Sequence, residues 1–241
     1  MTSTTPTLFT RRGQLYRRHC SANASFEEVA GAAVVCRYAE TDEEVRLASH
    51  LAIADLSTLP RAGFKGAGAP GWLEAQDVQL PHRANHSRRN ADGSLIARLS
   101  STEFLILADL VTKATLTSIL QDRLSLEPPQ GVYSLPRGDS HCWFAITGAS
   151  AASMLAKLCG VDLRTHKFGE REIAQTSLAR SNAIILRNDF ATTPGFFVLS
   201  DVSVTEYLWD SLLDAMLEFD GQPVGIAALR VLEGAEQRLQ Q

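Results

Sequence analysis

The sequence predicts an α+β fold of two subdomains, each built from an antiparallel sheet with flanking helices. Three observations favour this class. Segments with strand and helix patterns alternate along the whole chain. Two strand patterns within "SLIARLSSTEFLILADL" are separated by a Ser-Ser-Thr turn, which is typical of a hairpin. A strand, a glycine turn and a helix follow one another twice, in residues 64–80 and again in residues 146–163.

The composition is that of an ordinary globular protein. The chain has 241 residues, 45% of them hydrophobic, which is enough to bury a core. The net charge of −4 argues against nucleic acid as a partner. No apolar run approaches the ~20 residues that a bilayer span requires. The N-terminus lacks the order of a signal peptide, and the four cysteines show no C-x-x-C spacing. We therefore expect a cytoplasmic protein with no membrane partner and with reduced thiols.

Residues 1–28 are predicted to form an N-terminal arm, and residues 29–130 the first α+β subdomain. The arm is polar and basic without periodicity, so we expect an extended segment or a frayed helix that a partner orders. The elements expected after it are a strand at 32–39, a helix from Thr41 through Leu51, a polar loop at 81–94, the hairpin at 94–110 and a helix at 112–124.

The prolines of "EPPQG" end that last helix and mark the boundary with the second α+β subdomain, residues 131–241. Its expected elements are strands at 141–147, 172–189 and 196–201, with helices at 150–160 and 204–219. A C-terminal return segment completes this subdomain.

Gly66, Gly68 and Gly71 have the spacing G-x-G-x-x-G of a dinucleotide-binding turn. The second strand-turn-helix copy shows that this structure does not require three glycines, because Ser150 and Ser153 stand at the last two positions. The copies align with the pairs Gly66 and Gly148, Ala69 and Ala151, and Leu73 and Leu155. We interpret the first glycine as the end of a strand and predict no nucleotide site.

Four ordered stretches carry a family resemblance: "ADLSTLPRAGFKGAGAPGWL", "FAITGASAASMLAKLCGVDL", "IAQTSLARSNAIILR" and "EYLWDSLLDAM". Together they resemble the gamma subunit of heterotetrameric sarcosine oxidase, within the superfamily of the folate-binding aminomethyltransferase of glycine cleavage. The resemblance implies the first two domains of that aminomethyltransferase, without its third, β-barrel domain, for which the chain is too short.

The resemblance also implies a function, namely an accessory, structural subunit of a complex that oxidises an N-methylamine. In such a complex the larger catalytic subunits carry flavin, NAD and folate. One alternative is a tetrahydrofolate-binding component that transfers a one-carbon, aminomethyl unit in an N-demethylating enzyme system. Another is a free-standing folate-dependent repair or regulatory protein of the same superfamily.

The folate-binding pattern of the aminomethyltransferases is roughly R-T-G-Y-T-G-E-x-G-x-E, and its counterpart here is "RNDFATTPGFF". Arg187 and Gly195 match the pattern. Thr193 and Phe197 stand where the two glutamates are expected, so the carboxylates that would accept N–H bonds from a pterin are missing. Asp189 could supply an acid only in a changed register. Arg187 and Asp189 therefore remain candidate neighbours of tetrahydrofolate.

Asp92 is the candidate catalytic residue. In the relatives the catalytic aspartate lies in a G-G-x-x-D-D-L-I-V stretch, and "NADGSLIARL" is its nearest counterpart. In that role Asp92 would also be a neighbour of the folate. The alternative is that Asp92 only forms a hairpin turn, because Asp-Gly pairs are common turn residues.

No metal site is predicted. His82 and His86 have the spacing of helical metal ligands, with His50, His141 or Cys142 as a third ligand, but the preceding proline and polar neighbours indicate a loop. The run "DSHC" is not expected to be a catalytic triad, because consecutive residues point apart and triad members meet through the fold.

Overall fold

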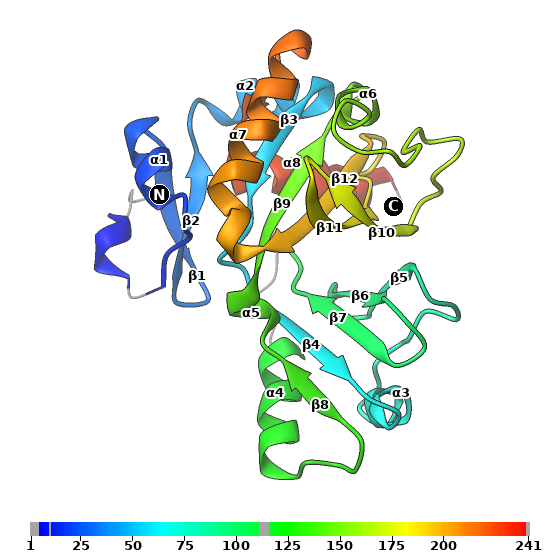
Figure 1. Cartoon of the computed structure of the whole chain (residues 1–241). Coiled ribbons are helices and arrows are strands. Elements are labelled where there is room, and N and C mark those ends of the chain that lie inside the picture. The colour runs from blue at the N-terminus through cyan, green and yellow to red at the C-terminus, as the bar shows by residue number, and fades with distance from the viewer. Residues whose placement is uncertain (1–4, 10, 111–115, 240–241) are drawn as a thin grey trace.

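The computed structural model describes residues 5–9, 11–110 and 116–239, apart from the side chains of 235–239. It confirms the α+β class, with two large, mainly antiparallel sheets, a separate two-stranded hairpin and flanking helices (Figure 1). Within the described ranges, no helix is long and apolar enough to cross a bilayer.

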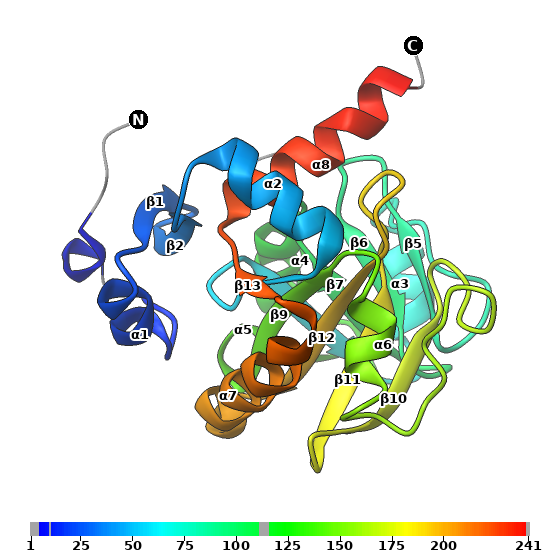
Figure 2. The same cartoon turned by 90° about the horizontal axis from the view of Figure 1, so that it is seen from above.

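A six-stranded sheet forms the upper body in Figure 1. Its strands, in spatial order, are β10 (Ile173–Leu178), β11 (Ser181–Arg187), β12 (Gly195–Asp201), β9 (His141–Thr147), β3 (Ala52–Asp55) and β13 (Gln222–Pro223). Neighbouring strands pair antiparallel, except that β13 runs parallel to β3. Helices α6 (Ala151–Leu155) and α7 (Thr205–Met216) cover one face, and α2 (Thr41–His50) and α8 (Ile226–Leu239) lie on the other (Figure 2).

A five-stranded antiparallel sheet forms the lower body. Its strands, in spatial order, are β5 (His86–Arg89), β6 (Leu95–Arg98), β7 (Glu103–Leu107), β4 (Arg61–Lys65) and β8 (Tyr133–Leu135). Helices α3 (Ala69–Glu74) and α4 (Leu116–Leu126) pack on its outer face. Strand periodicity divides its side chains between two cores: Phe104 and Ile106 face those helices, while Leu105 and Leu107 join the core shared with the six-stranded sheet.

The remaining elements lie at the edges of the two bodies. They are β1 (Ser25–Val29) and β2 (Ala32–Arg37), which form a hairpin, helices α1 (Tyr16–Ser21) and α5 (Arg137–Ser140), and the single 3₁₀ turns η1 (Pro6–Leu8), η2 (Val202–Val204) and η3 (Leu217–Phe219).

The chain crosses from the six-stranded to the five-stranded sheet at residues 56–60 and returns at residues 136–140. Strand β3, from the predicted first subdomain, therefore lies in the six-stranded sheet. Strand β8 follows the predicted boundary at residue 130 yet lies in the five-stranded sheet. The two sheets thus exchange strands across that boundary, because the strand pairs form between segments far apart in sequence.

Several predicted elements need correction. The helix expected through Leu51 ends at His50, and the next residues form β3 between β9 and β13. The polar loop at 81–94 contains β5. The strand expected at 172–189 is two strands, which turn at Ala179 and Arg180 with φ of 48° and 65°. The return segment ends in α8, and residues 112–115 of the helix expected at 112–124 lie outside the described residues.

The repeated strand-turn-helix unit is confirmed. Gly66 follows β4 with φ of 127°, and Gly148 follows β9 with φ of 111°. A Cβ on Gly66 would lie 2.1 Å from the carbonyl oxygen of Gly131, and one on Gly148 would lie 2.3 Å from that of His50. Both positions therefore require glycine. The paired alanines and leucines of both copies are fully buried: Ala69, Leu73, Ala151 and Leu155.

The backbone amides of Gly66 and Gly68 form hydrogen bonds within the chain that hold this turn. The amide of Gly66 donates to the carbonyl of Thr102 at 2.9 Å, and that of Gly68 donates to Gly131 at 3.0 Å, so neither is available to a pyrophosphate. The turn also joins an antiparallel strand to a helix of six residues. Gly71 faces open space, whereas a Cβ on Gly68 would lie 2.6 Å from the carbonyl oxygen of Gln130.

The N-terminal segment is anchored in the folded body rather than extended throughout. Helix α1 covers residues 16–21, and the side chain of Leu15 before it is fully buried in the core beneath α6 and α7. His19 on α1 is also buried, with its Nε2 3.0 Å from Oδ2 of Asp55 and its Nδ1 2.7 Å from the hydroxyl of Tyr38. The segment thus owes its order to contacts within the chain.

Candidate functional site

Asp92 lies in the turn between β5 and β6, where its carboxylate closes the turn. Its Oδ1 accepts from the backbone amide of Ser94 at 3.1 Å and from Nδ2 of Asn90 at 3.1 Å. Its Oδ2 accepts from the Ser94 hydroxyl at 2.8 Å. Gly93 then adopts a φ of 87°. These bonds are those of an Asx turn, so the geometry matches the turn interpretation of Asp92.

Arg187 and Asp189 form an ion pair at the end of β11. The guanidinium donates to both carboxylate oxygens, at 3.0 and 2.6 Å, and its Nη1 donates to the carbonyls of Thr165 and Phe168. Asp189 Oδ1 also accepts from the amide of Gly195 at 3.1 Å. The pair raises the pKa of Arg187, mainly through the hydrogen bond to Asp189. Both charges therefore hold the loop that precedes β12.

Asn188, between these two residues, is the centre of a polar cluster that we call the Asn188 cluster: Arg89, Arg171, Asn188 and Glu233. The fully buried Asn188 accepts through Oδ1 from Arg89 at 2.9 Å and from Arg171 at 2.8 Å. Arg89 also donates to the carbonyl of Gly93 at 2.9 Å and pairs with Glu233 at 3.2 Å. This cluster brings the Asp92 turn and the end of β11 together through Arg89.

The two positions expected to hold glutamates present no anion. Phe197 is buried in the core shared by the two sheets, edge-on to Trp143 at 5.2 Å and to Phe190 at 5.9 Å between ring centroids. Thr193 pairs with Phe190 through two backbone hydrogen bonds of 2.8 and 2.9 Å. Apolar packing therefore occupies the position of the second glutamate, and a pterin there would find no carboxylate to accept its N–H groups.

A second polar cluster, which no pattern in the sequence predicts, lies where the two sheets meet. Arg137 on α5 pairs with Glu103 on β7 and donates through Nη1 to Nε2 of His141 at 2.8 Å. Lys65 lies 3.2 Å from Oε2 of the same glutamate. Ser140 lies beside His141, with its Oγ 2.8 Å from Nδ1. The expectation that consecutive residues of "DSHC" point apart is wrong for this pair, because α5 passes directly into β9.

The environment of His141 keeps its ring neutral. Burial, followed by the positive charges of Arg137 and Arg61, lowers the pKa of His141 to about 4. Its Nε2 can therefore accept from Arg137 at neutral pH. His141 opens onto a shallow groove of about 470 Å³ along the six-stranded sheet, lined also by Gln175, Asn182, Ile184, Leu199 and Asp201.

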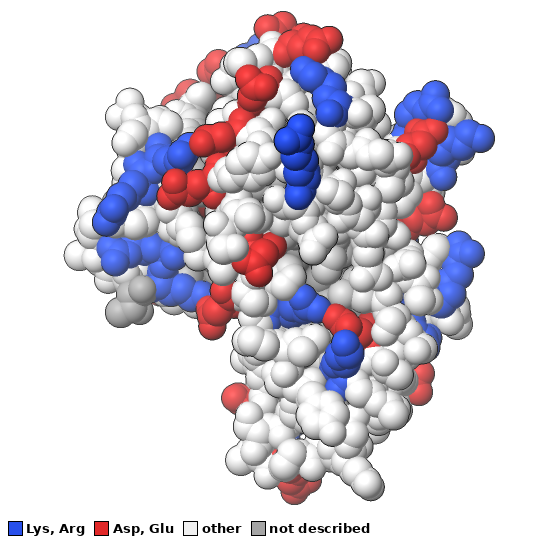
Figure 3. Space-filling view, viewed as in Figure 1, with Lys and Arg blue, Asp and Glu red and all other residues white. Residues whose placement is uncertain are grey.

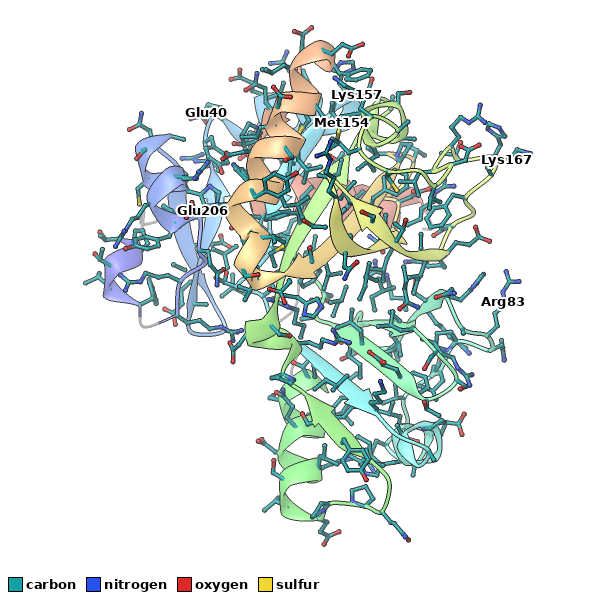
Figure 4. All side chains as sticks on the ribbon, in the orientation of Figure 1. Glu40, Arg83, Met154, Lys157, Lys167 and Glu206 are labelled. Atoms are coloured by element: carbon teal, nitrogen blue, oxygen red, sulfur yellow. The ribbon has the colours of Figure 1, made fainter. Side chains whose placement is uncertain are left out.

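The other residues considered for chemistry do not converge. His86 accepts from Arg83, which is labelled on the lower body in Figure 4, and His50 bonds to the carbonyl of Phe219. Burial, as the largest cause, raises the pKa of the Cys142 thiol to about 11, so this sulfur is a poor nucleophile. Among the described residues, no group of three or more His, Cys, Asp or Glu side chains could hold a metal ion.

The fold is a two-sheet body whose polar clusters mainly join its own segments. The GCVT N-terminal domain model matches residues 15–237, and the chain belongs to that family.

Relatives of two kinds are similar to the chain. The aminomethyltransferase of Saccharopolyspora erythraea is 25% identical over 90% of this chain and 61% of its own length. The sarcosine oxidase subunit gamma of Corynebacterium sp. is 28% identical over 68% of this chain and 77% of its own length. The chain thus spans about three fifths of the aminomethyltransferase and about three quarters of the gamma subunit.

Two solved structures are similar to the chain in fold. The glycine cleavage aminomethyltransferase of Bartonella henselae matches with a TM-score of 0.71 and 19% identity, over 92% of this chain and 62% of that chain. A chain of heterotetrameric sarcosine oxidase from Corynebacterium sp. U-96, solved with pyrrole 2-carboxylate, matches with a TM-score of 0.59 and 25% identity. That match covers 85% of this chain and 92% of the other.

Proposed function

We propose that this chain is an accessory, structural subunit of a heteromeric complex similar to sarcosine oxidase. One observation carries the proposal: Thr193 and Phe197 stand where the folate-binding pattern has its two glutamates, and Phe197 is buried in the core. The similarity to a sarcosine oxidase subunit gamma, at 28% identity, and to a chain of heterotetrameric sarcosine oxidase, at 25% identity, supports the same role. The self-contained bonding of Asp92, Arg187 and Asp189 supports it, because an accessory subunit needs no free catalytic group.

In such a complex the larger subunits hold the flavin, NAD and folate and oxidise a secondary N-methylamine. This chain supplies a folded surface on which they assemble. Its partners are therefore proteins, in a hetero-oligomer in the cytoplasm, and it binds tetrahydrofolate weakly or not at all.

The second candidate is a tetrahydrofolate-binding component that transfers a one-carbon unit. Membership of the GCVT family and the retained Arg187 favour it. For this candidate, Asp92 would have to give up its bonds to Ser94, and the core around Phe197 would have to open to a pterin.

Titration with tetrahydrofolate in a calorimeter separates the two candidates. We expect no saturable heat at millimolar folate, since Thr193 and Phe197 offer no carboxylate. A glycine cleavage aminomethyltransferase titrated in the same buffer is the positive control. A dissociation constant of ~1 μM, which is a binding free energy of about −8 kcal/mol, would contradict the accessory role and favour the transfer component.

A further inference from the structure

A groove between α1 and α7 is lined largely by apolar and aromatic atoms. Its volume is about 470 Å³, and its walls include Arg17, Arg18, His19, Tyr38, Trp209 and Leu213. Trp209 packs edge-on to His19 with 5.3 Å between ring centroids. Such a groove fits an apolar side chain that enters between the two helices.

Positive charge gathers beside this groove. Figure 3 shows blue side chains over the N-terminal segment at the left of the molecule. Tyr16 lies between the guanidinium groups of Arg12 and Arg17, at 4.9 and 5.5 Å from its ring centroid. Arg12 and Arg17 are exposed, and neither forms an ion pair with a carboxylate of the described residues. Arg18 differs, because it pairs with Glu206 and Asp210 on α7.

Contacts within the chain hold this surface in place before any partner binds. Leu15 is fully buried, and His19 is bonded to both Asp55 and Tyr38, so the helix that carries Arg17 is fixed to the body. A preformed surface avoids the entropy cost of ordering a segment on binding. The two unpaired cations are therefore available for charges supplied from outside the chain.

We propose that this surface, made of the α1–α7 groove with Arg12 and Arg17, binds an acidic segment of a larger partner subunit. An apolar side chain of that segment enters the groove, and carboxylates beside it pair with Arg12 and Arg17. The proposal rests on the accessory role stated above. Phosphate backbones fit less well, since nucleic-acid binding typically uses about 6–10 cationic contacts and here the groove is apolar.

The test uses the chain co-expressed and purified with the larger subunits of its native complex, and measures assembly by size-exclusion chromatography and binding by interferometry. The double variant Arg12→Glu/Arg17→Glu is expected to bind ~10–100-fold more weakly and to lose most of its salt dependence. A second variant, Ala22→Trp, fills the groove from an exposed wall residue. It should weaken binding while the salt dependence stays as in wild type.

The matched control is Arg46→Glu/Lys167→Glu. It changes the net charge by the same amount as Arg12→Glu/Arg17→Glu, at exposed positions outside the surface made of the α1–α7 groove with Arg12 and Arg17. Figure 4 shows Lys167 on the opposite side of the body from Glu206, which lies near α1. The control should bind as wild type does, and circular dichroism should be unchanged in all variants. The proposal would be overturned if the control lost as much affinity for the larger subunits as Arg12→Glu/Arg17→Glu and Ala22→Trp do. It would also be overturned if those two variants bound within twofold of wild type.

Two further outcomes are distinguishable. If the wild-type chain recovers no larger subunit, the accessory role fails and this inference fails with it. In the other outcome, the complex assembles normally with Arg12→Glu/Arg17→Glu and Ala22→Trp, but these variants no longer bind phosphatidylserine vesicles that wild type binds. The surface is then a membrane contact, and only this inference is overturned.

Discussion

Replacement of Arg61 by methionine is expected to lower the free energy of unfolding by about 3–5 kcal/mol. The Arg61 side chain is buried, and its guanidinium donates to the carbonyls of Ser57, Leu59, Arg137, Gly138 and His141. Methionine fills similar volume but leaves these five acceptors without their donor. Each buried unsatisfied carbonyl costs about 1–3 kcal/mol, with part of the cost recovered by relaxation.

The position of Arg61 explains why one side chain has so large an effect. Its five acceptors come from the two segments through which the chain crosses between the sheets, residues 56–60 and the stretch around α5. Burial, and then the charge of Arg11, lowers the pKa of Arg61 to about 10, so the guanidinium remains charged at neutral pH. Arg61 thus ties both crossings together.

Urea unfolding followed by circular dichroism measures the effect. Arg61→Lys keeps the charge but cannot reach all five carbonyls. We therefore expect its free energy of unfolding to lie between those of wild type and Arg61→Met. The control is Arg46→Met on the exposed face of α2, which should change stability by about 0.5 kcal/mol or less. Equal stability of Arg61→Met and Arg46→Met would show that the crossings hold without the guanidinium.

His19→Ala is expected to cost about 3 kcal/mol at neutral pH, because it leaves the buried Asp55 carboxylate with hydrogen bonds from Ser57 only. Burial alone would raise the pKa of Asp55, but the hydrogen bond and charge of His19, together with hydrogen bonds from Ser57, outweigh burial and hold the pKa below its ordinary value. Tyr38 completes the chain of bonds. Burial, and then the charges of Asp55 and Glu44, raises the pKa of Tyr38, so its hydroxyl stays protonated beside Nδ1 of His19.

The sign of the pH dependence distinguishes this mechanism from simple loss of packing. In wild type, the Asp55 contribution is present above the pKa of the unfolded chain and is lost as the pH falls through the lower folded value. Without His19, the folded pKa of Asp55 rises, and the variant loses stability as the pH rises toward that value. The stability gap should therefore widen between pH 4 and pH 7.

Urea unfolding of both proteins at several pH values tests this prediction. Tyr38→Phe, which removes only the hydroxyl, is the control and should cost about 1 kcal/mol. A gap between wild type and His19→Ala that stays constant from pH 4 to pH 7 would show that the loss comes from packing and not from the Asp55 charge.

Local patterns in the sequence were sufficient for much of the fold. The hairpin of β6 and β7 follows from its alternation and turn. The equivalence of Gly66 and Gly148 follows from spacing alone, because both glycines end a strand at a place where only a residue without Cβ fits. The turn role of Asp92 also follows from its neighbours, since its bonding partners are two residues away.

Long-range pairing could not be predicted in this way. Residues 52–55 continue the helical periodicity of α2, yet β3 forms because β9 and β13 bind its two edges. His19 looked like part of a solvated basic arm, and only the fold brings it to Asp55. The Asn188 cluster and the contacts of His141 likewise join residues from separate elements. No local pattern records such contacts.

Purification of the tagged chain from its native host, followed by native mass spectrometry, tests the central claim most directly. The accessory role predicts a stoichiometric complex with larger subunits that contain flavin and oxidise an N-methylamine, with no folate retained when this chain is separated from them. A chain recovered alone or only with its own copies, with tetrahydrofolate bound, would contradict that role.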